Sequence, residues 1–117
     1  IIDKCESSTS KNSDLYLNLA FNYGFKNELL DVINIIKNDS NKIYNNNNLR
    51  ELFYLGKIPD PDLLIRTGGY KRLSNFILFN LSYTELFFTD TLWPNFEKDE
   101  FNKIIKNYYK IERKYGL

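Results

Sequence analysis

The segment around Gly68 and Gly69 combines two arginines and a serine with these two glycines, a set of residue types that suits the binding of phosphate groups. Arginine presents a planar fork of N–H donors that matches two phosphate oxygens at once, and a serine hydroxyl can add a further donor. The glycines would let the backbone approach a phosphate closely. Arg66, Arg72 and Ser74 are therefore the candidates for binding a diphosphate and for catalysis beside it.

The same residue types allow a simpler interpretation. A Gly-Gly pair is common in ordinary turns, and both arginines could be solvated surface charges. A ligand site is favoured by the position of Arg66 at the end of residues 62–67, an apolar stretch that predicts a buried strand. Ligands of open α/β sheets gather outside the carboxyl ends of the strands. Periodicity alone does not decide between these two interpretations.

Glu85 is a carboxylate within an otherwise apolar stretch, residues 83–88. An unpaired carboxylate in such a place would be costly, so we expect Glu85 to meet a cation. The cation could be a nearby lysine or arginine in an ion pair, or a Mg²⁺ ion shared with substrate phosphates, since Mg²⁺ often uses only one or two protein carboxylates. The residues alone leave both alternatives open.

Three apolar stretches predict the strands that would position these residues. Residues 15–22 are nearly continuously apolar, as expected for a strand buried on both faces, and Gly24 then allows a turn. Residues 62–67 and 83–88 predict the other two strands.

Apolar patterns predict four helices between and after the strands, although the period of residues 73–81 is ambiguous. The clearest is the amphipathic pattern of residues 26–37, and Gly56 would end the next helix. The helices are expected at residues 26–37, 49–55 and 73–81, and from residue 99 through the stripe Phe101, Ile104, Ile105, Tyr108 and Ile111 to an end at Gly116. Two polar stretches, residues 1–13 and the asparagine-rich residues 38–48, predict loops.

Strands that alternate with helices predict an α/β fold, the C-terminal part of a mainly parallel sheet flanked by helices. Three strands are fewer than the usual five or six of a sheet, so we expect further strands upstream. The absence of methionine agrees with a fragment. The expected organisation is a loop or disordered lead-in at residues 1–14, and the C-terminal half of a single domain at residues 15–117.

Composition narrows the function classes. The formal net charge of +1 provides no broad field for nucleic acid or an anionic membrane. The single cysteine, Cys5, cannot form an internal disulfide, which favours a reducing compartment. No apolar run approaches the ~20 residues needed to span a bilayer.

Several ordered motifs together resemble a known family. Residues 62–96 contain Asp-Leu-Leu-Ile-Arg-Thr-Gly-Gly, Arg-Leu-Ser-Asn-Phe, Tyr-Thr-Glu-Leu-Phe-Phe-Thr-Asp and Leu-Trp-Pro-Asn-Phe in sequence. They closely resemble the C-terminal signature of undecaprenyl and dehydrodolichyl diphosphate synthases, the cis-prenyltransferases. The Asn-Tyr-Gly block that ends at Gly24 and the Glu-Arg-Lys-Tyr-Gly ending resemble further motifs of that family.

The resemblance implies a fold like that of undecaprenyl diphosphate synthase and a role for each candidate. Arg66, Arg72 and Ser74 would hold the diphosphate of isopentenyl diphosphate, and Glu85 would bind Mg²⁺. The reaction implied is ionisation of an allylic prenyl diphosphate, attack by the isopentenyl double bond, and proton loss to a new cis double bond. Repetition would give a long-chain polyprenyl diphosphate of the dolichol or undecaprenol type.

Three departures and one missing motif qualify the resemblance. Lys71 replaces a frequent histidine, and Lys26 stands where the family has arginine. The C-terminal Arg-x-Gly, which in the family touches the isopentenyl diphosphate of the partner subunit, appears as Lys114-Tyr115-Gly116, so Lys114 and Gly116 are further candidates for binding the diphosphate. The family's Asp-Gly-Asn-Gly-Arg phosphate loop does not occur in the sequence, so we expect this fragment to be inactive alone.

The family also implies a homodimer or a heterodimer with a related subunit. The aromatic residues Phe87, Phe88, Trp93 and Phe96 could belong to that contact or be ordinary core. The expected location is the cytoplasm, or the periphery of the endoplasmic reticulum membrane through the lipid product. An alternative function is a non-catalytic subunit of a two-component synthase, and a phosphate-binding module for nucleotides or RNA is less consistent with the neutral charge.

Overall fold

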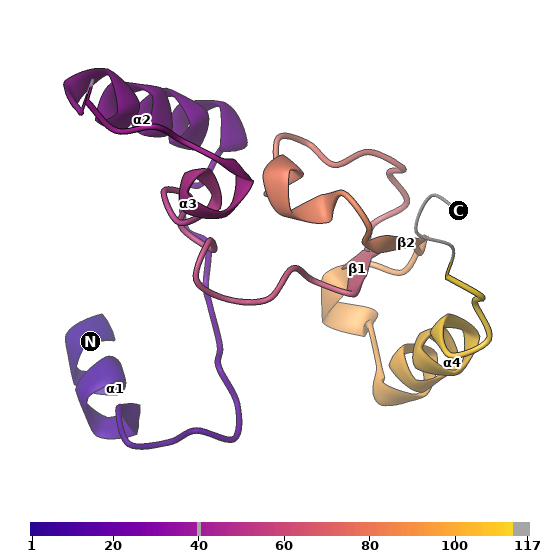
Figure 1. Cartoon of the computed structure of the whole chain (residues 1–117). Coiled ribbons are helices and arrows are strands. Elements are labelled where there is room, and N and C mark those ends of the chain that lie inside the picture. Colours follow the sequence, from indigo (N-terminus) through magenta and orange to yellow (C-terminus); the bar gives the residue numbers. More distant parts are fainter. Residues whose placement is uncertain (40, 114–117) are drawn as a thin grey trace.

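Two short parallel strands form the centre of the computed structural model, which describes residues 1–39 and 41–113 (Figure 1). Strand β1 (Leu63–Arg66) pairs with β2 (Glu85–Phe88), with Leu63 opposite Glu85 and Arg66 opposite Phe88. Because the strands are parallel, their carboxyl ends lie at the same edge. These two strands, and the α/β fold with a small parallel sheet flanked by helices, confirm the prediction.

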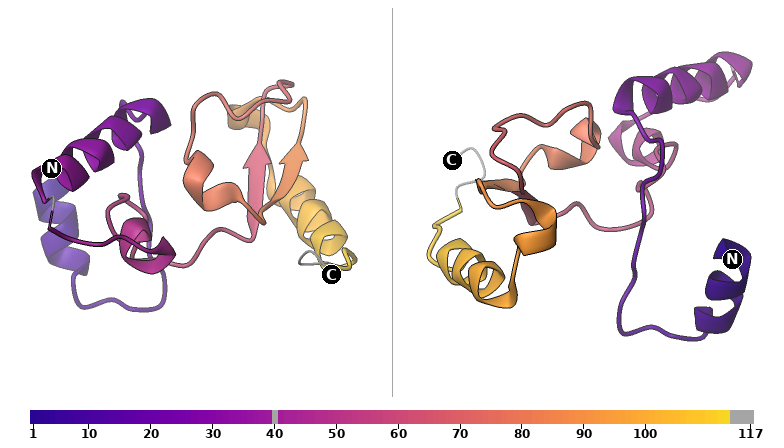
Figure 2. Two further views of the ribbon diagram at one scale, coloured as in Figure 1. Left: turned by 45° about the horizontal axis from the view of Figure 1, so that its top comes forward. Right: turned by 180° about the vertical axis from the view of Figure 1, so that it is seen from behind.

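The third predicted strand, residues 15–22, is wrong. Residues 15–20 form no regular element, and their large apolar side chains are exposed, with Leu15 at 82% and Leu17 at 77%. A strand needs a neighbour for its backbone N–H and C=O groups, and no segment of the described residues pairs with this one. The segment runs extended between the first two helices (Figure 2).

Helix α2 (Phe25–Asn38) confirms the amphipathic pattern and buries Val32 and Glu28. Helix α3 (Asn46–Arg50) begins within the asparagine run, where a loop was predicted, and residues 51–57 form turns in place of the expected helix. The cause is a capping box. The Asn45 side chain accepts the N–H groups of Asn47 and Asn48, and the Asn48 side chain accepts the N–H of Asn45.

The first and last helices also differ from the predictions. Helix α1 (Ile2–Thr9) occupies the predicted lead-in loop, although none of its residues is buried. Its hydroxyl groups donate to carbonyls of the preceding turn, as Thr9 does to Cys5. Helix α4 (Lys98–Tyr108) buries Ile104 and ends before Ile111, earlier than expected.

The helix predicted at residues 73–81 is reduced to the 3₁₀ turn η1 (Leu78–Leu81). Ser74, Asn75 and Ile77 before it have positive φ values of 48°, 63° and 35°, a conformation that a right-handed helix cannot contain. A second 3₁₀ turn, η2 (Trp93–Asn95), follows β2.

The core is small and lies mainly between α2 and η1. Phe53 stacks on Phe79 at a ring-centroid distance of 4.0 Å and on Phe25 at 6.2 Å. The radius of gyration is 17.2 Å, whereas about 13 Å is typical of a compact chain of this length. Helices α2 and α3 lie on one side of the strand pair and α4 on the other (Figures 1 and 2). Within the described residues, no helix combines the length and apolar character needed to cross a bilayer.

Candidate anion-binding site

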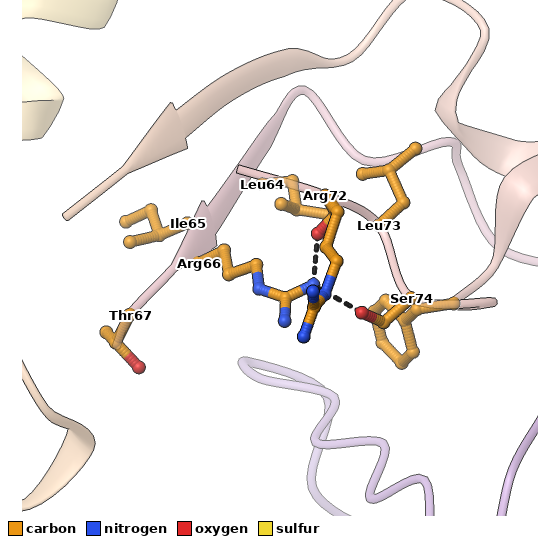
Figure 3. A pocket seen from close by; sticks show the side chains of 8 residues that line it. Leu64, Ile65, Arg66, Thr67, Arg72, Leu73 and Ser74 are labelled. Carbon is orange, nitrogen blue, oxygen red and sulfur yellow. Dashed lines mark hydrogen bonds between the residues drawn. The ribbon is translucent and has the colours of Figure 1, made fainter. Parts of the chain in front are cut away.

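Arg66 ends β1 and directs its guanidinium into the loop that follows. Its Nη1 donates to the backbone carbonyl of Arg72. The same atom donates to Oγ of Ser74, at a distance of 2.8 Å (Figure 3). The loop therefore folds back over the end of the strand. The three residues predicted to act together, Arg66, Arg72 and Ser74, meet at the carboxyl edge of the sheet.

A cavity of about 330 Å³ lies at this edge, and all three residues line it. Apolar side chains, among them Leu64 and Phe76, form other parts of the wall. Small-molecule sites typically occupy about 300–1,000 Å³, and they combine a mostly apolar wall with a few convergent polar groups. The cavity fits a ligand with one anionic group and a hydrocarbon part.

The positive charges of Arg66 and Arg72 have no ion-pair partner among the described residues. Neither of these two guanidinium groups has a described carboxylate oxygen within 4.0 Å. The ion pairs of the described residues involve Arg50 and Arg113 instead. Both guanidinium groups lie over the ring of Tyr70 instead, with that of Arg72 at 4.4 Å and that of Arg66 at 6.0 Å from the ring centroid. A cation–π contact orients a guanidinium but leaves its charge available. Two such groups beside one cavity favour an anion with several oxygens.

The glycines do not offer their N–H groups to a ligand, contrary to our expectation that the backbone approaches a phosphate here. Gly68 N–H donates to the Thr91 carbonyl at 2.8 Å, and Gly69 N–H donates to the Thr89 carbonyl at 2.9 Å. Their φ values of +89° and +80° explain why glycine is needed. The glycines tie the loop after β1 to the segment after β2, so the turn interpretation is correct for them.

The loop that holds Ser74 has a strained backbone. Non-glycine residues with positive φ cost on the order of 1–3 kcal/mol each, and they persist only where the surroundings hold them. Asn75, to which the sequence analysis assigned no role, connects this loop to the start of α2. It accepts the N–H of Phe25 with its carbonyl and the N–H of Lys26 with its side chain. The Ser-Asn pair was the available signal, because asparagine tolerates the left-handed conformation.

A buried carboxylate supports the wall of the cavity from behind. Tyr23 packs edge-on against Phe76 at 5.8 Å, and its hydroxyl donates to the buried Glu28. Glu28 also accepts the N–H of Tyr54 at 2.7 Å. Burial, and then the bond to Glu28, raise the pKa of Tyr23 well above its usual value, so the phenol stays a neutral donor at physiological pH.

Glu85 lies away from this cavity. It stands opposite Leu63 in the strand pair, so it is about 10 Å from the level of Arg66 along the strands. Its Oε1 is 4.0 Å from Nε of Arg113, whose guanidinium also donates to Asp62 and to the Tyr83 carbonyl, both at 2.7 Å. The ion-pair alternative for Glu85 matches this geometry.

The donor set around Glu85 does not fit a metal that is shared with a diphosphate at Arg66 of the same chain. The described residues contain no group of three or more histidine, cysteine, aspartate or glutamate side chains that could hold a metal ion. Asp62 is the nearby carboxylate, and both Asp62 and Glu85 face Arg113. The guanidinium of Arg113 therefore already supplies the positive charge beside these two carboxylates.

The remaining candidates contribute less. Lys114 and Gly116 lie outside the described residues. The side chains of Lys26 and Lys71 are exposed. Trp93 is 75% exposed and stacks on Phe96 at 6.3 Å, whereas Phe87 and Phe88 are half-buried, so Trp93 is not core in this chain.

Comparison with known proteins identifies the family. Residues 1–116 match a prenyltransferase family model described as "Putative undecaprenyl diphosphate synthase". The isoprenyl transferase of Fusobacterium nucleatum is 42% identical over 98% of this chain and 50% of its own length, and that of Aquifex aeolicus is 41% identical over 99% and 50%. The chain thus spans about half the length of these curated relatives.

Solved structures agree with the family model. A probable undecaprenyl diphosphate synthase from Campylobacter jejuni matches 99% of this chain and 54% of its own, with a TM-score of 0.85 and 36% identity. Lavandulyl diphosphate synthase from Lavandula x intermedia, solved in complex with dimethylallyl diphosphate, matches 99% and 52% with a TM-score of 0.88 and 28% identity. This chain therefore belongs to the undecaprenyl diphosphate synthase family of prenyltransferases.

Proposed function

We propose that the protein that contains this chain is a cis-prenyltransferase, which condenses isopentenyl diphosphate with an allylic prenyl diphosphate to form a long-chain polyprenyl diphosphate. The carrying observation is the pair of guanidinium groups, Arg66 and Arg72, that line one cavity without a carboxylate among the described residues. The names of the relatives support the same reaction class. A purely structural subunit would have no need of this arrangement.

In this proposal Arg66, Arg72 and Ser74 bind the diphosphate of isopentenyl diphosphate. The two guanidinium groups supply charge and paired donors, and the serine hydroxyl, which now accepts from Arg66, can turn its proton toward a phosphate oxygen. The apolar wall around Leu64 and Phe76 would take the short hydrocarbon part. Lys114 and Gly116 stay predicted contacts of a diphosphate.

The reaction follows from these roles. The C–O bond of the allylic diphosphate breaks, and the diphosphate leaves with the electron pair. The isopentenyl double bond attacks the allylic cation, and loss of a proton forms the new cis double bond. Fixed positive charge around the diphosphates stabilises the charge that develops on the leaving group, which is usually the largest catalytic contribution in such a site. This chain's own residues hold the nucleophilic partner in place.

We keep Mg²⁺ as the proposed metal of the full-length enzyme, in which it would neutralise a diphosphate. Glu85 as its ligand is still a prediction, and its ion pair with Arg113 does not favour that role. Titration of Mg²⁺ against the activity of Glu85→Gln would decide the point. A higher half-saturating concentration would assign Glu85 to the metal, and an unchanged one would leave it with Arg113.

Assembly and location are also proposals. The exposed Trp93 and its neighbour Phe96 suit contact with a second subunit, in a homodimer or a heterodimer. We propose that the enzyme is cytoplasmic and that its polyprenyl product is of the dolichol or the undecaprenol type. With a dolichol-type product, the enzyme would contact the endoplasmic reticulum membrane through that lipid. Light scattering of the full-length protein would measure the assembly.

The test of the function uses the full-length protein. With Mg²⁺, labelled isopentenyl diphosphate and farnesyl diphosphate, we expect labelled polyprenyl diphosphates that extraction and chromatography resolve by length. At isopentenyl diphosphate concentrations well below KM, the Arg66→Ala variant should form much less product than the wild type, and a product yield that the variant leaves unchanged would indicate contaminating activity. Absence of any elongated product, also with a longer allylic starter, would refute the function.

A further inference from the structure

The loop from Arg72 to Ile77 carries Ser74 into the cavity in a conformation that ordinary residues avoid. Ser74, Asn75 and Ile77 all have positive φ. The loop alone would therefore not keep Ser74 directed at Arg66. Contacts from outside the loop must stabilise this backbone conformation. The contacts of Asn75 identify the support.

Asn75 caps a helix that is remote in the sequence. The first N–H groups of a helix have no partner within the helix, and Gly24, at the N-cap of α2, has no side chain to provide one. The Asn75 carbonyl accepts the N–H of Phe25 at 2.8 Å, and its Oδ1 accepts the N–H of Lys26 at 2.9 Å. Asn75 thus satisfies α2 and is fixed by it at two points.

Gly24 completes this contact. A Cβ atom at Gly24 would lie 2.7 Å from Nδ2 of Asn75, which is closer than such atoms approach one another. The φ of Gly24 is −151°, which any residue adopts, so the contact with Asn75 is the local reason for glycine. The Asn-Tyr-Gly block and the Arg-Leu-Ser-Asn block therefore meet through these two residues.

We infer that Asn75 is a positioning residue, which holds the Ser74 hydroxyl, and through it the Arg66 guanidinium, in the geometry that binds a diphosphate. Ser74 lies between two fixed points. On one side the Arg72 carbonyl is bonded to Arg66, and on the other Asn75 is bonded to α2. This inference rests on the proposed function, but it concerns a residue that does not itself line the cavity.

The experiment is a double-mutant cycle in the full-length enzyme, with KM for isopentenyl diphosphate as the main readout. Asn75→Gly keeps the freedom for positive φ but removes the side-chain acceptor. We expect a rise in KM of about fivefold with kcat within twofold. In a Ser74→Ala background the same change should raise KM by less than twofold, because Asn75 acts through Ser74.

Two further variants separate positioning from general stability. Gly24→Ala displaces Asn75 by contact and should reproduce the KM effect; it replaces Asn75→Gly in the cycle if that variant does not fold. Asn102→Gly, at an exposed position of α4, weakens a helix without touching the loop and should leave KM unchanged. Isothermal titration of inorganic diphosphate should show the same order of affinities without turnover.

The outcomes are distinguishable. Inactivity of the wild-type full-length protein would reject the proposed function. An active wild type in which Asn75→Gly leaves KM unchanged, lowers only kcat, or adds its full effect to Ser74→Ala would overturn the positioning role.

Discussion

The two ends of the strand pair use arginine in opposite ways. At the carboxyl end, Arg66 donates to a carbonyl and a hydroxyl, and Arg72 lies on Tyr70. At the amino end, Arg113 meets the carboxylates of Asp62 and Glu85. The first end keeps its positive charge in a cavity, whereas the second cancels it.

This difference separates a binding site from an anchor. Arg50 follows the second pattern, since it pairs with Asp60 at 2.9 Å and donates to the Ile58 carbonyl at 2.5 Å. A guanidinium whose partners are neutral can take up an anion without losing an ion pair. A guanidinium that already holds carboxylates would have to give them up, so its contribution is to stability.

The largest expected effect is that of Arg66→Ala on substrate binding. Loss of charged hydrogen bonds, which contribute about 1.5–3 kcal/mol each, should raise KM for isopentenyl diphosphate roughly ten- to a hundred-fold. The free energy of unfolding should fall by less than with Arg113→Ala, because the acceptors that lose a donor, the Arg72 carbonyl and the Ser74 hydroxyl, are neutral and exposed. Steady-state kinetics and urea unfolding of the full-length protein measure both quantities. An unchanged KM would remove Arg66 from the site.

Arg113→Ala should show the reverse pattern. It leaves Asp62, Glu85 and the Tyr83 carbonyl without this donor, so we expect a loss of about 1–2 kcal/mol of unfolding free energy, since the pairs are partly exposed. KM for isopentenyl diphosphate should rise less than threefold. Arg113→Lys, which keeps the charge, should recover part of the stability. A KM effect as large as that of Arg66→Ala would end the distinction between the two ends.

Arg72→Lys tests whether the carboxyl end needs a fork or only a charge. Lysine keeps the charge but loses the planar donor pair and the stacking on Tyr70, so KM should rise about three- to tenfold, or about 1 kcal/mol. Lys71→Ala, which removes the exposed charge next to it, is the matched control and should have a smaller effect. Equal KM values for Arg72→Lys and wild type would mean that charge alone suffices.

The parts of this comparison that the sequence predicted are those with local causes. Strands β1 and β2 were readable as apolar runs, and α2 was readable from its amphipathic spacing. Arg66 and Arg72 were identified because arginine chemistry near a strand end is itself informative. The predicted meeting of Arg66, Arg72 and Ser74 follows from their closeness along the chain.

What the sequence did not predict depends on distant partners or on side chains that act on the backbone. Residues 15–22 have the composition of a strand, but composition does not provide the neighbour that a strand requires. Asn45 turned a predicted loop into a helix start by capping it. Asn75 caps the start of α2, a helix that was predicted, but this contact comes from far along the chain and was not. Arg113 lies in a polar ending, and only the fold shows that it reaches Asp62.

The smallest expected effect concerns the ion pair between Glu85 and Arg113 at the amino end of the strand pair. Glu85 and Arg113 are 4.0 Å apart and partly exposed, so a double-mutant cycle of Glu85→Gln and Arg113→Gln should give a coupling of about 0.5 kcal/mol in unfolding free energy. The Asp62–Arg113 pair is closer, at 2.7 Å, but Asp62 is more exposed, so a similar coupling is expected there. After removal of Glu85, Arg113 still pairs with Asp62 and donates to the Tyr83 carbonyl, which is why the coupling stays small. A coupling near zero for Glu85, together with a higher Mg²⁺ requirement of Glu85→Gln, would show that the carboxylate serves a metal and that the amino end is not merely an anchor.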